Sequence, residues 1–210
     1  MKVTAVVPQK RDTQKYNIFI DGEYRFALPM QDVLYFRLKE GNEVSEDTVE
    51  FILDSLVYVR AQDTALHYIG YKMRTAAEIE RKLSEKEFSA EVIEKVMGFL
   101  KKYGYADDRE YCRKYIRERL RLHPRSAYVI RMELRQKGVR TEDVDAVFSE
   151  TVFDEAEDAY RLLEKRARGM FPTEEKKKNQ LLGFLQRKGY SWDIISEAFS
   201  RLEQEYGGGR

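Results

Sequence analysis

An internal repeat of 51 residues is the feature that most limits what this chain can fold into. When the sequence is shifted against itself by 51 residues, and then by twice that distance, apolar residues align three deep from about residue 59 onward. With 42% hydrophobic residues, a triplet would be entirely apolar by chance only roughly once in fourteen. The nine aligned triplets are Ala61/Cys112/Leu163, Ala65/Ile116/Ala167, Ile69/Leu120/Phe171, Ile79/Ile130/Leu181, Leu83/Leu134/Leu185, Phe88/Val139/Tyr190, Ile93/Val144/Ile195, Val96/Val147/Ala198 and Met97/Phe148/Phe199.

Inside each repeat the apolar positions are spaced as they are in helices. Positions 61, 65 and 69 lie four apart, as do positions 79 and 83. Each repeat therefore reads as three helices, the second and third joined by a short turn. Gly138 and Gly189 suit a left-handed helix stop in that turn. The residues expected to cap the helix that follows are Ser89, Thr141 and Ser191.

The N-terminal part differs, because it predicts strands. The runs 15–20 and 23–28 are rich in β-branched and aromatic residues, and Asp21-Gly22 separates them. Two such residues between alternating runs favour a tight hairpin, since both accept positive φ. Residues 3–7 could add a third strand.

Helices are expected to follow the hairpin. Pro29 suits the first turn of a short helix that runs through Leu38. Ser45 is the expected N-cap of the next helix. Its predicted apolar face comprises Val49, Ile52, Leu53, Leu56 and Val59.

These patterns predict a mainly α protein of three tandem three-helix repeats, with a small N-terminal β-hairpin element. No Ser/Pro-rich linker separates the repeats, so we expect them to stack into an elongated, curved body. The expected divisions are a hairpin with helices (1–58), repeat 1 (59–108), repeat 2 (109–152), repeat 3 (153–206) and a flexible tail (207–210).

The net charge of +1 conceals strong banding. Residues 109–140 carry eleven Lys/Arg and three acids, for a local charge of +8. Residues 141–158 carry eight acids and no base, and residues 161–188 return to +6. One interpretation is a solvated helix surface whose charges balance in space. The other is a basic surface that meets an acidic partner, nucleic acid or both.

Other sequence features set limits on the class of protein. No apolar run is long enough to span a membrane, and the N-terminus lacks the pattern of a signal peptide. Cys112 is the single cysteine, so no intramolecular disulfide can form. We therefore expect a cytoplasmic protein without membrane contact.

Catalytic and metal-binding motifs give no support to an enzyme. Asp107-Asp108 could be paired carboxylates, but we favour a helix cap with an acid in the first turn. His67, His123 and Cys112 do not make the four-ligand set of a structural zinc site. With no glycine-rich phosphate loop either, we expect no catalytic residue, no metal and no cofactor.

Several tyrosines lie near basic residues and could stack on bases, as in proteins that bind single-stranded DNA. Core and inter-repeat packing is the interpretation we favour for most of them. The tyrosines concerned are Tyr68, Tyr71, Tyr103, Tyr105, Tyr111 and Tyr115.

Three segments resemble the RecX family. The first is the junction Gly104-Tyr-Ala-Asp-Asp108, followed by a helix with aromatic and basic residues from Tyr111 to Arg117. The second is residues 130–139, and the third is the hairpin of residues 16–26 with Asp32-Val-Leu34 after it, which is similar to the N-terminal extension of Gram-positive members. The resemblance covers about residues 14–205. Its structural junction residues are Gly104, Tyr105, Asp107, Asp108 and Tyr111.

The resemblance implies a non-enzymatic regulator in DNA repair, homologous recombination and the SOS response. RecX-like proteins bind the RecA recombinase filament on single-stranded DNA, lie along its groove and inhibit its ATPase and strand-exchange activity. On this basis we expect a monomer that binds the RecA filament, with single-stranded DNA as a second candidate partner. The candidate partner-binding residues are Arg113, Lys114, Arg117, Arg121, Arg125, Arg131, Arg135, Lys165, Arg166, Arg168, Lys176, Lys177 and Lys178.

The alternative is a protein that binds nucleic acid by itself. The turn between the second and third helices resembles a helix-turn-helix, but the third helices are acidic, which a phosphate backbone disfavours. Direct contact with single-stranded DNA would then use the basic band, without sequence preference.

Overall fold

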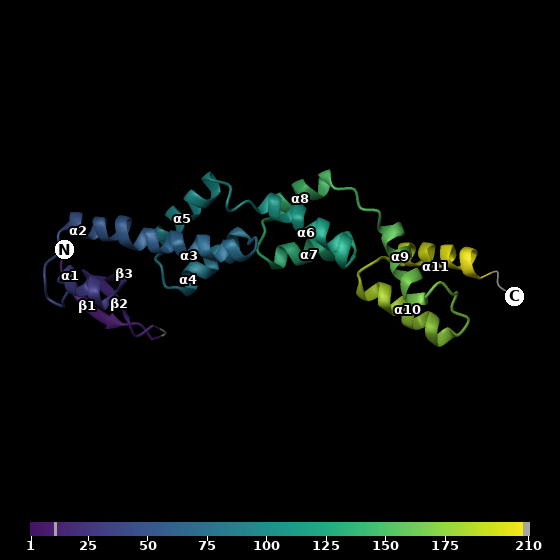
Figure 1. The fold of residues 1–210 in the computed structure, drawn as a ribbon, viewed down its shortest axis with the longest axis horizontal. Helices are drawn as coiled ribbons and strands as arrows, with labels where there is room; N and C mark the ends of the chain where they lie inside the picture. The colour runs from purple at the N-terminus through teal and green to yellow at the C-terminus, as the bar shows by residue number, and fades with distance from the viewer. Residues whose placement is uncertain (11, 208–210) are drawn as a thin grey trace. The chain divides into compact units, whose positions relative to one another are not determined.

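The computed structural model describes residues 1–10 and 12–207, and it divides into two compact units, Met1–Asp107 and Asp108–Arg210. The first unit contains the strands and the first repeat, and the second contains the second and third repeats (Figure 1). The predicted tail at 207–210 lies, from residue 208 on, outside the described residues.

A three-stranded antiparallel sheet, in the order β1-β2-β3, begins the first unit. The predicted hairpin is confirmed, with Asp21 and Gly22 at φ 51° and 88° between β2 and β3. The predicted third strand is confirmed as β1, which pairs with β2. Ile18 and Phe26 are register partners on the buried face. The strands are β1 (Val3–Pro8), β2 (Lys15–Ile20) and β3 (Glu23–Pro29).

The short helix α1 (Met30–Tyr35) starts after Pro29, but the expectation that it runs through Leu38 is wrong. Arg37 adopts φ 53°, and the amide of Leu38 turns back to the carbonyl of Val33, 2.9 Å away. This left-handed residue ends the helix early because it directs Leu38 into the core, where 3% of the side chain remains exposed.

A continuous helical path follows, through α2 (Glu46–Ile52), the π-helical turn η1 (Leu53–Val57) and α3 (Tyr58–Tyr71). Ser45 caps it as predicted, accepting a hydrogen bond from the amide of Thr48. The placement of Val59 on the apolar face is wrong, since Val59 is 44% exposed and Val57 is buried instead. The π turn adds a residue to one turn and so rotates the face that follows.

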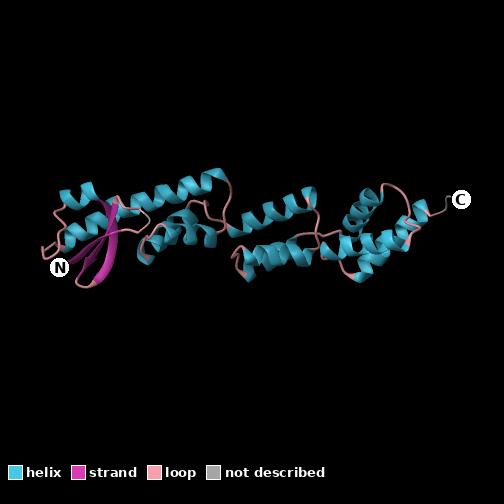
Figure 2. Cartoon of the chain, turned by 90° about the horizontal axis from the view of Figure 1, so that it is seen from below, coloured by secondary structure: helices cyan, strands magenta, loops and turns pink. Residues whose placement is uncertain are grey.

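The three repeats are confirmed as trios of helices, and Figure 2 shows that strands occur only beside the first of them in the described chain. The first aligned triplet, Ala61, Cys112 and Leu163, is fully buried in all three copies. Cys112 is thus a core residue, as its register predicted. The repeats are α3, α4 (Ala76–Glu85) and α5 (Ala90–Lys102); α6 (Asp108–Leu122), α7 (Ala127–Gln136) and α8 (Thr141–Glu150); and α9 (Glu155–Ala167), α10 (Glu175–Arg187) and α11 (Trp192–Tyr206).

The turn before each third helix has a left-handed residue. Gly138 and Gly189 fill this position as predicted, and Glu87 adopts it in the first repeat at φ 61°. Ser89 and Ser191 cap the helices that follow, but the prediction for Thr141 is wrong.

The N-cap of α8 is Arg140, which occupies the register position of Ser89 and Ser191 and makes no side-chain cap hydrogen bond. Its guanidinium instead pairs with Asp143 in the first turn, 2.8 Å away. A side chain that binds an acid of the first turn thus replaces a capping hydroxyl.

One hydrophobic cluster of the first unit joins sheet residues such as Ile18 and Phe26 to first-repeat residues such as Ile79 and Leu83. The helical path also crosses position 58 without interruption. The predicted domain divisions and the curved stacking of the repeats stay predictions.

Candidate functional site

Helix α6 presents the first group of predicted binding residues. It follows Asp107, with Asp108 and Glu110 in its first turn and Arg119 and Arg121 in its last turn. This arrangement places acids at the positive end of the helix dipole and bases at the negative end. Tyr111, Cys112 and Ile116 form the buried face, which leaves most of the basic residues on the outside.

The first part of the basic stripe is neutralised by α8. Arg109 donates from Nε to Oδ1 of Asp143 over 2.9 Å, and Arg113 lies 3.4 Å from a carboxylate oxygen of Glu150. Arg113 also lies 3.6 Å from Glu110. For these residues the interpretation of charges balanced in space is the right one.

Asp143 is a charged residue in an otherwise apolar position, with 7% of its side chain exposed. Burial by itself would raise the pKa of this carboxyl, but hydrogen bonds from Arg109 and Arg140 hold it below its usual value. The carboxylate therefore stays ionised and fixes α8 against α6.

The remaining part of the stripe has no such partner. Lys114, Arg117 and Arg121 are exposed, and within the part of the chain that the structure describes they form no ion pair. Their spacing of three and four residues places them on one side of α6, opposite Cys112 and Ile116. We call these three residues the α6 basic face.

A second cluster surrounds Glu133 on α7. Arg119 lies 2.9 Å and Arg125 3.5 Å from its carboxylate oxygens, and the hydroxyl of Tyr115 donates to it over 2.8 Å. Burial and the charges of Arg125 and Arg119 lower the pKa of Lys188 from the third repeat. Two arginines thus share the carboxylate of Glu133, and a third cation, Lys188, lies near those arginines; we call these residues the Glu133 cluster.

The sequence indicated Arg125 from this cluster but missed Arg119 and Lys188. Lys188 lies 69 positions beyond Arg119, so neither periodicity nor local composition connects them. The contact between the second and third repeats brings Lys188 near Arg119. At this contact the amide of Ser126 donates a hydrogen bond to the carbonyl of Lys188 over 3.1 Å.

The two predicted arginines of α7 differ in their surroundings. Arg131 forms an ion pair with Asp145 and lies over the ring of Phe148, 4.4 Å from its centroid. Arg135 is exposed and has no ion pair among the described residues. The charge of Arg131 is therefore used inside the repeat, and that of Arg135 is available.

The third repeat supplies the last predicted residues from α9 and α10. Arg166 lies over Phe184, 4.6 Å from the ring centroid, and Lys177 pairs with Glu174 at 2.6 Å. Arg168 ends α9 in the left-handed conformation, at φ 56°. No ion pair within residues 1–10 and 12–207 engages Lys165, Arg166, Arg168, Lys176 or Lys178.

The predicted junction residues lie at the end of α5 and the start of α6. Gly104 takes φ 73° directly after the C-cap of α5, and the amide of Tyr105 binds the carbonyl of Leu100 over 2.8 Å. Asp107 stands at the position of an N-cap, directly before Asp108 begins α6.

The tyrosines fall into two groups. Tyr111 is buried and stacks on Tyr115, with ring centroids 6.0 Å apart, as the packing interpretation expects. Tyr71, Tyr103 and Tyr105 instead expose more than half of their surface.

Within the described residues, no three His, Cys, Asp or Glu side chains are grouped so that they could hold a metal ion. Of the helices that the structure describes, none has the length and apolar character needed to cross a bilayer. Among the described residues of the second unit, the predicted binding residues without an ion pair lie on the α6 basic face, at Arg135 and in the third repeat.

Four family models match the chain in succession. They are the "Regulatory protein RecX N-terminal domain" (residues 1–45) and the first, second and third three-helix domains of RecX (residues 61–100, 107–147 and 154–199). The last three coincide with the three helical repeats.

Relatives match over nearly the whole length. The chain is 32% identical over 208 residues to the "Regulatory protein RecX" of Bacillus subtilis (strain 168), which covers 97% of this chain and 78% of the relative. It is 30% identical to the protein of the same name from Clostridioides difficile (strain 630), with 95% of both chains covered.

Solved structures show the same fold. A "Crystal structure of regulatory protein RecX" aligns with a TM-score of 0.60 and 29% identity, over 93% of this chain and 97% of the other. The structure of RecX from Lactobacillus salivarius aligns with a TM-score of 0.61 over 70% of this chain and 97% of the other, and at 24% identity it supports the fold alone.

Proposed function

The chain belongs to the RecX family of regulatory proteins, and from this premise we propose that it binds the RecA filament on single-stranded DNA and inhibits its ATPase and strand-exchange activity. It acts by binding and not by catalysis, as a monomer in the cytoplasm. Its relatives are named as regulatory proteins, which agrees with a role of this kind.

The observation that supports this proposal is the α6 basic face. Lys114, Arg117 and Arg121 are solvated cations that the rest of the described chain leaves unpaired, while their neighbours Arg109 and Arg113 are paired with α8. A filament of protein on DNA presents carboxylates and phosphates that such a face can bind. Arg135 and the unpaired cations of the third repeat can bind carboxylates and phosphates in the same way.

The paired arginines have a different role in this proposal. Arg113, Arg125 and Arg131 are held by carboxylates of their own repeat, so they contribute mainly to its stability. Lys177 is held in the same way by Glu174, on the surface. The contact with the filament therefore depends most on the residues without an internal partner.

The test is a charge reversal of the α6 basic face, Lys114→Glu with Arg117→Glu and Arg121→Glu. We expect the concentration for half-inhibition of the RecA ATPase on single-stranded DNA to rise at least about tenfold, because each lost charge contact weakens binding. Lys10→Glu with Lys39→Glu and Lys72→Glu is the matched control, since it makes the same change in net charge at exposed residues of the first unit. Far-UV circular dichroism verifies that helical content is unchanged.

Full inhibition by the basic-face variant would contradict the assignment to this face. Direct binding to DNA is the competing function, and a salt titration of single-stranded DNA binding without RecA separates the two. Tight binding at physiological salt, with a steep dependence on salt, would favour the competing function.

A further inference from the structure

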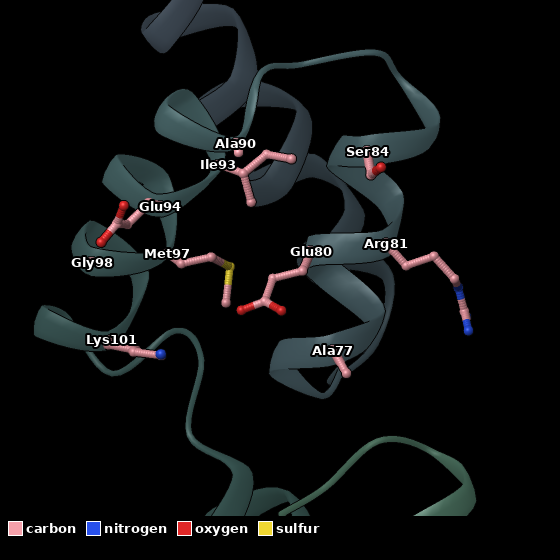
Figure 3. Close-up of a pocket in the computed structure, with 10 residues that line it drawn as sticks. All are labelled: Ala77, Glu80, Arg81, Ser84, Ala90, Ile93, Glu94, Met97, Gly98 and Lys101. Carbon is pink, nitrogen blue, oxygen red and sulfur yellow. The ribbon is translucent and has the colours of Figure 1, made fainter.

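A groove between α4 and α5 opens on the surface of the first repeat (Figure 3). Its volume is about 660 Å³, and small residues, Ala77, Ala90 and Gly98, create the space. Figure 3 shows Glu80 from α4 and Met97 from α5 directed toward each other across it.

The second repeat fills the equivalent position with one of its own side chains. In the 51-residue register, Arg131 corresponds to Glu80, Phe148 to Met97 and Asp145 to Glu94. Arg131 lies over the Phe148 ring and pairs with Asp145. An arginine between the second and third helices is thus accommodated by this repeat fold.

The third repeat fills it with an apolar residue. Leu182 stands at the position of Glu80 and packs against the cluster that contains Phe199, the counterpart of Met97. The first repeat has neither an arginine nor an apolar residue at this position. Glu80 stands there instead; it is exposed and carries the same charge as Glu94. Glu80 is directed into the groove, whereas Glu94 lines it from α5 with its carboxylate turned to the outside (Figure 3), so two exposed acids border the apolar residues Met97 and Ile93.

We propose that this groove receives an arginine side chain from a partner protein. The aliphatic stem lies on Met97 and Ile93, and Glu80 binds the guanidinium. The exposed side chain of Glu94 turns toward the groove on binding and supplies a second carboxylate, at the position from which Asp145 binds Arg131 in the second repeat. A planar guanidinium can contact two carboxylates and an apolar surface at the same time, which a lysine ammonium does less well.

The two basic residues that line the groove, Arg81 and Lys101, do not occupy the proposed guanidinium site beside Glu80. Arg81 lies 3.9 Å from Glu85 and is directed away from the groove in Figure 3. Lys101 lines the groove from the last turn of α5, two turns beyond Glu94. It repels a cation at that end and so directs the guanidinium toward the acids. The inference does not depend on the proposed function, because that function uses the second unit.

The test uses the full chain with ¹³C-methyl-labelled methionine and two probes, Nα-acetyl-arginine N-methylamide and its neutral isostere Nα-acetyl-citrulline N-methylamide. We expect a saturable shift of the Met97 methyl resonance with the arginine probe, and at least about threefold weaker binding of the citrulline probe. Glu80→Gln with Glu94→Gln should abolish the shift, and Glu50→Gln, an exposed acid of α2, should leave it unchanged.

A second variant places in the first repeat the arginine that the second repeat has at the equivalent position. Glu80→Arg should fill the groove from within, raise the Tm by about 2–4 °C and eliminate binding of the arginine probe. The rise in Tm should disappear when Glu94→Gln is added, because the new guanidinium then lacks its carboxylate.

Three results would overturn the proposal. The first is a Met97 methyl shift that is equal with both probes or absent with both. The second is a rise in the Tm of Glu80→Arg that persists when Glu94→Gln is added. The third is a Met97 resonance that changes with protein concentration in the absence of any probe. The last result would mean that a second copy of the chain occupies the groove.

Discussion

Arg109 donates a 2.9 Å hydrogen bond to Asp143, which lies 34 residues later in the chain and has only 7% of its side chain exposed. This contact joins the basic helix α6 to the acidic helix α8. It is one of the contacts through which the stretch of charge +8 and the following stretch of charge −8 partly neutralise each other in the fold. It also separates the arginines that hold the repeat together from those that remain available.

Asp143→Asn should lower the free energy of unfolding of the second unit by about 1–3 kcal/mol at pH 7, because charge-assisted hydrogen bonds are lost. The fold depresses the pKa of Asp143. The ionised carboxylate therefore stabilises the fold at pH values above its pKa in the unfolded chain, and this stabilisation is lost as the pH falls through its pKa in the folded chain. The difference between variant and parent should therefore narrow below about pH 4. Urea unfolding monitored by Trp192, in the same unit, measures this, with Glu142→Gln as the control.

Gly189→Ala should disturb the contact between the second and third repeats. Its φ is 89°, and an added Cβ would lie 2.2 Å from Cγ2 of Val129 and 2.6 Å from Oγ of Ser126. We expect a loss of about 2–4 kcal/mol, from backbone strain and overpacking together. Gly104→Ala, at φ 73° with open space around it, should cost only about 1 kcal/mol.

Removing the Val129 methyl groups tests whether their clash with the added Cβ causes the loss of stability in Gly189→Ala. Val129→Ala in the Gly189→Ala background should recover part of the loss, since Ser126 still limits the space. Thermal unfolding of all four proteins gives the comparison. Equal costs at the two glycines would contradict the packing explanation.

Glu87→Gly should stabilise the first unit by about 0.5–1 kcal/mol, because φ 61° strains a residue with a Cβ and the other repeats have glycine there. Glu87→Ala, which keeps the strain, should give no gain. Burial and the charge of Glu87 raise the pKa of Tyr24 to about 12. Ultraviolet titration of Glu87→Gly should show a lower pKa for Tyr24, still above its usual value of about 10 because burial remains.

Glu133→Gln should destabilise the second unit by about 1–3 kcal/mol, because Arg119 and Arg125 lose the carboxylate that separates them and Lys188 lies nearby. Repulsion among the cations is screened by ions, so the loss should shrink as sodium chloride is added. Glu118→Gln, an exposed change on α6, is the control. A loss independent of salt would contradict the role of charge.

The sequence predicted what depends on local periodicity. The three trios of helices follow from the 51-residue register, and the hairpin follows from two residues that accept positive φ. Three local expectations were wrong because the structure departs at those positions from regular helical spacing or from hydroxyl capping. The π turn removed Val59 from the apolar face, Leu38 left its helix for the core, and Arg140 displaced Thr141 as the N-cap of α8.

The sequence by itself determined the repeat, the aligned buried positions within the repeats and the bands of charge, because helical spacing and composition are properties of neighbouring residues. Only the tertiary structure decided which charges are matched. It paired Arg109 and Arg113 with α8, brought Lys188 to Arg119, and left Lys114, Arg117 and Arg121 without a partner among the described residues. Coulomb energy depends on distance in space, and separation along the chain does not fix that distance.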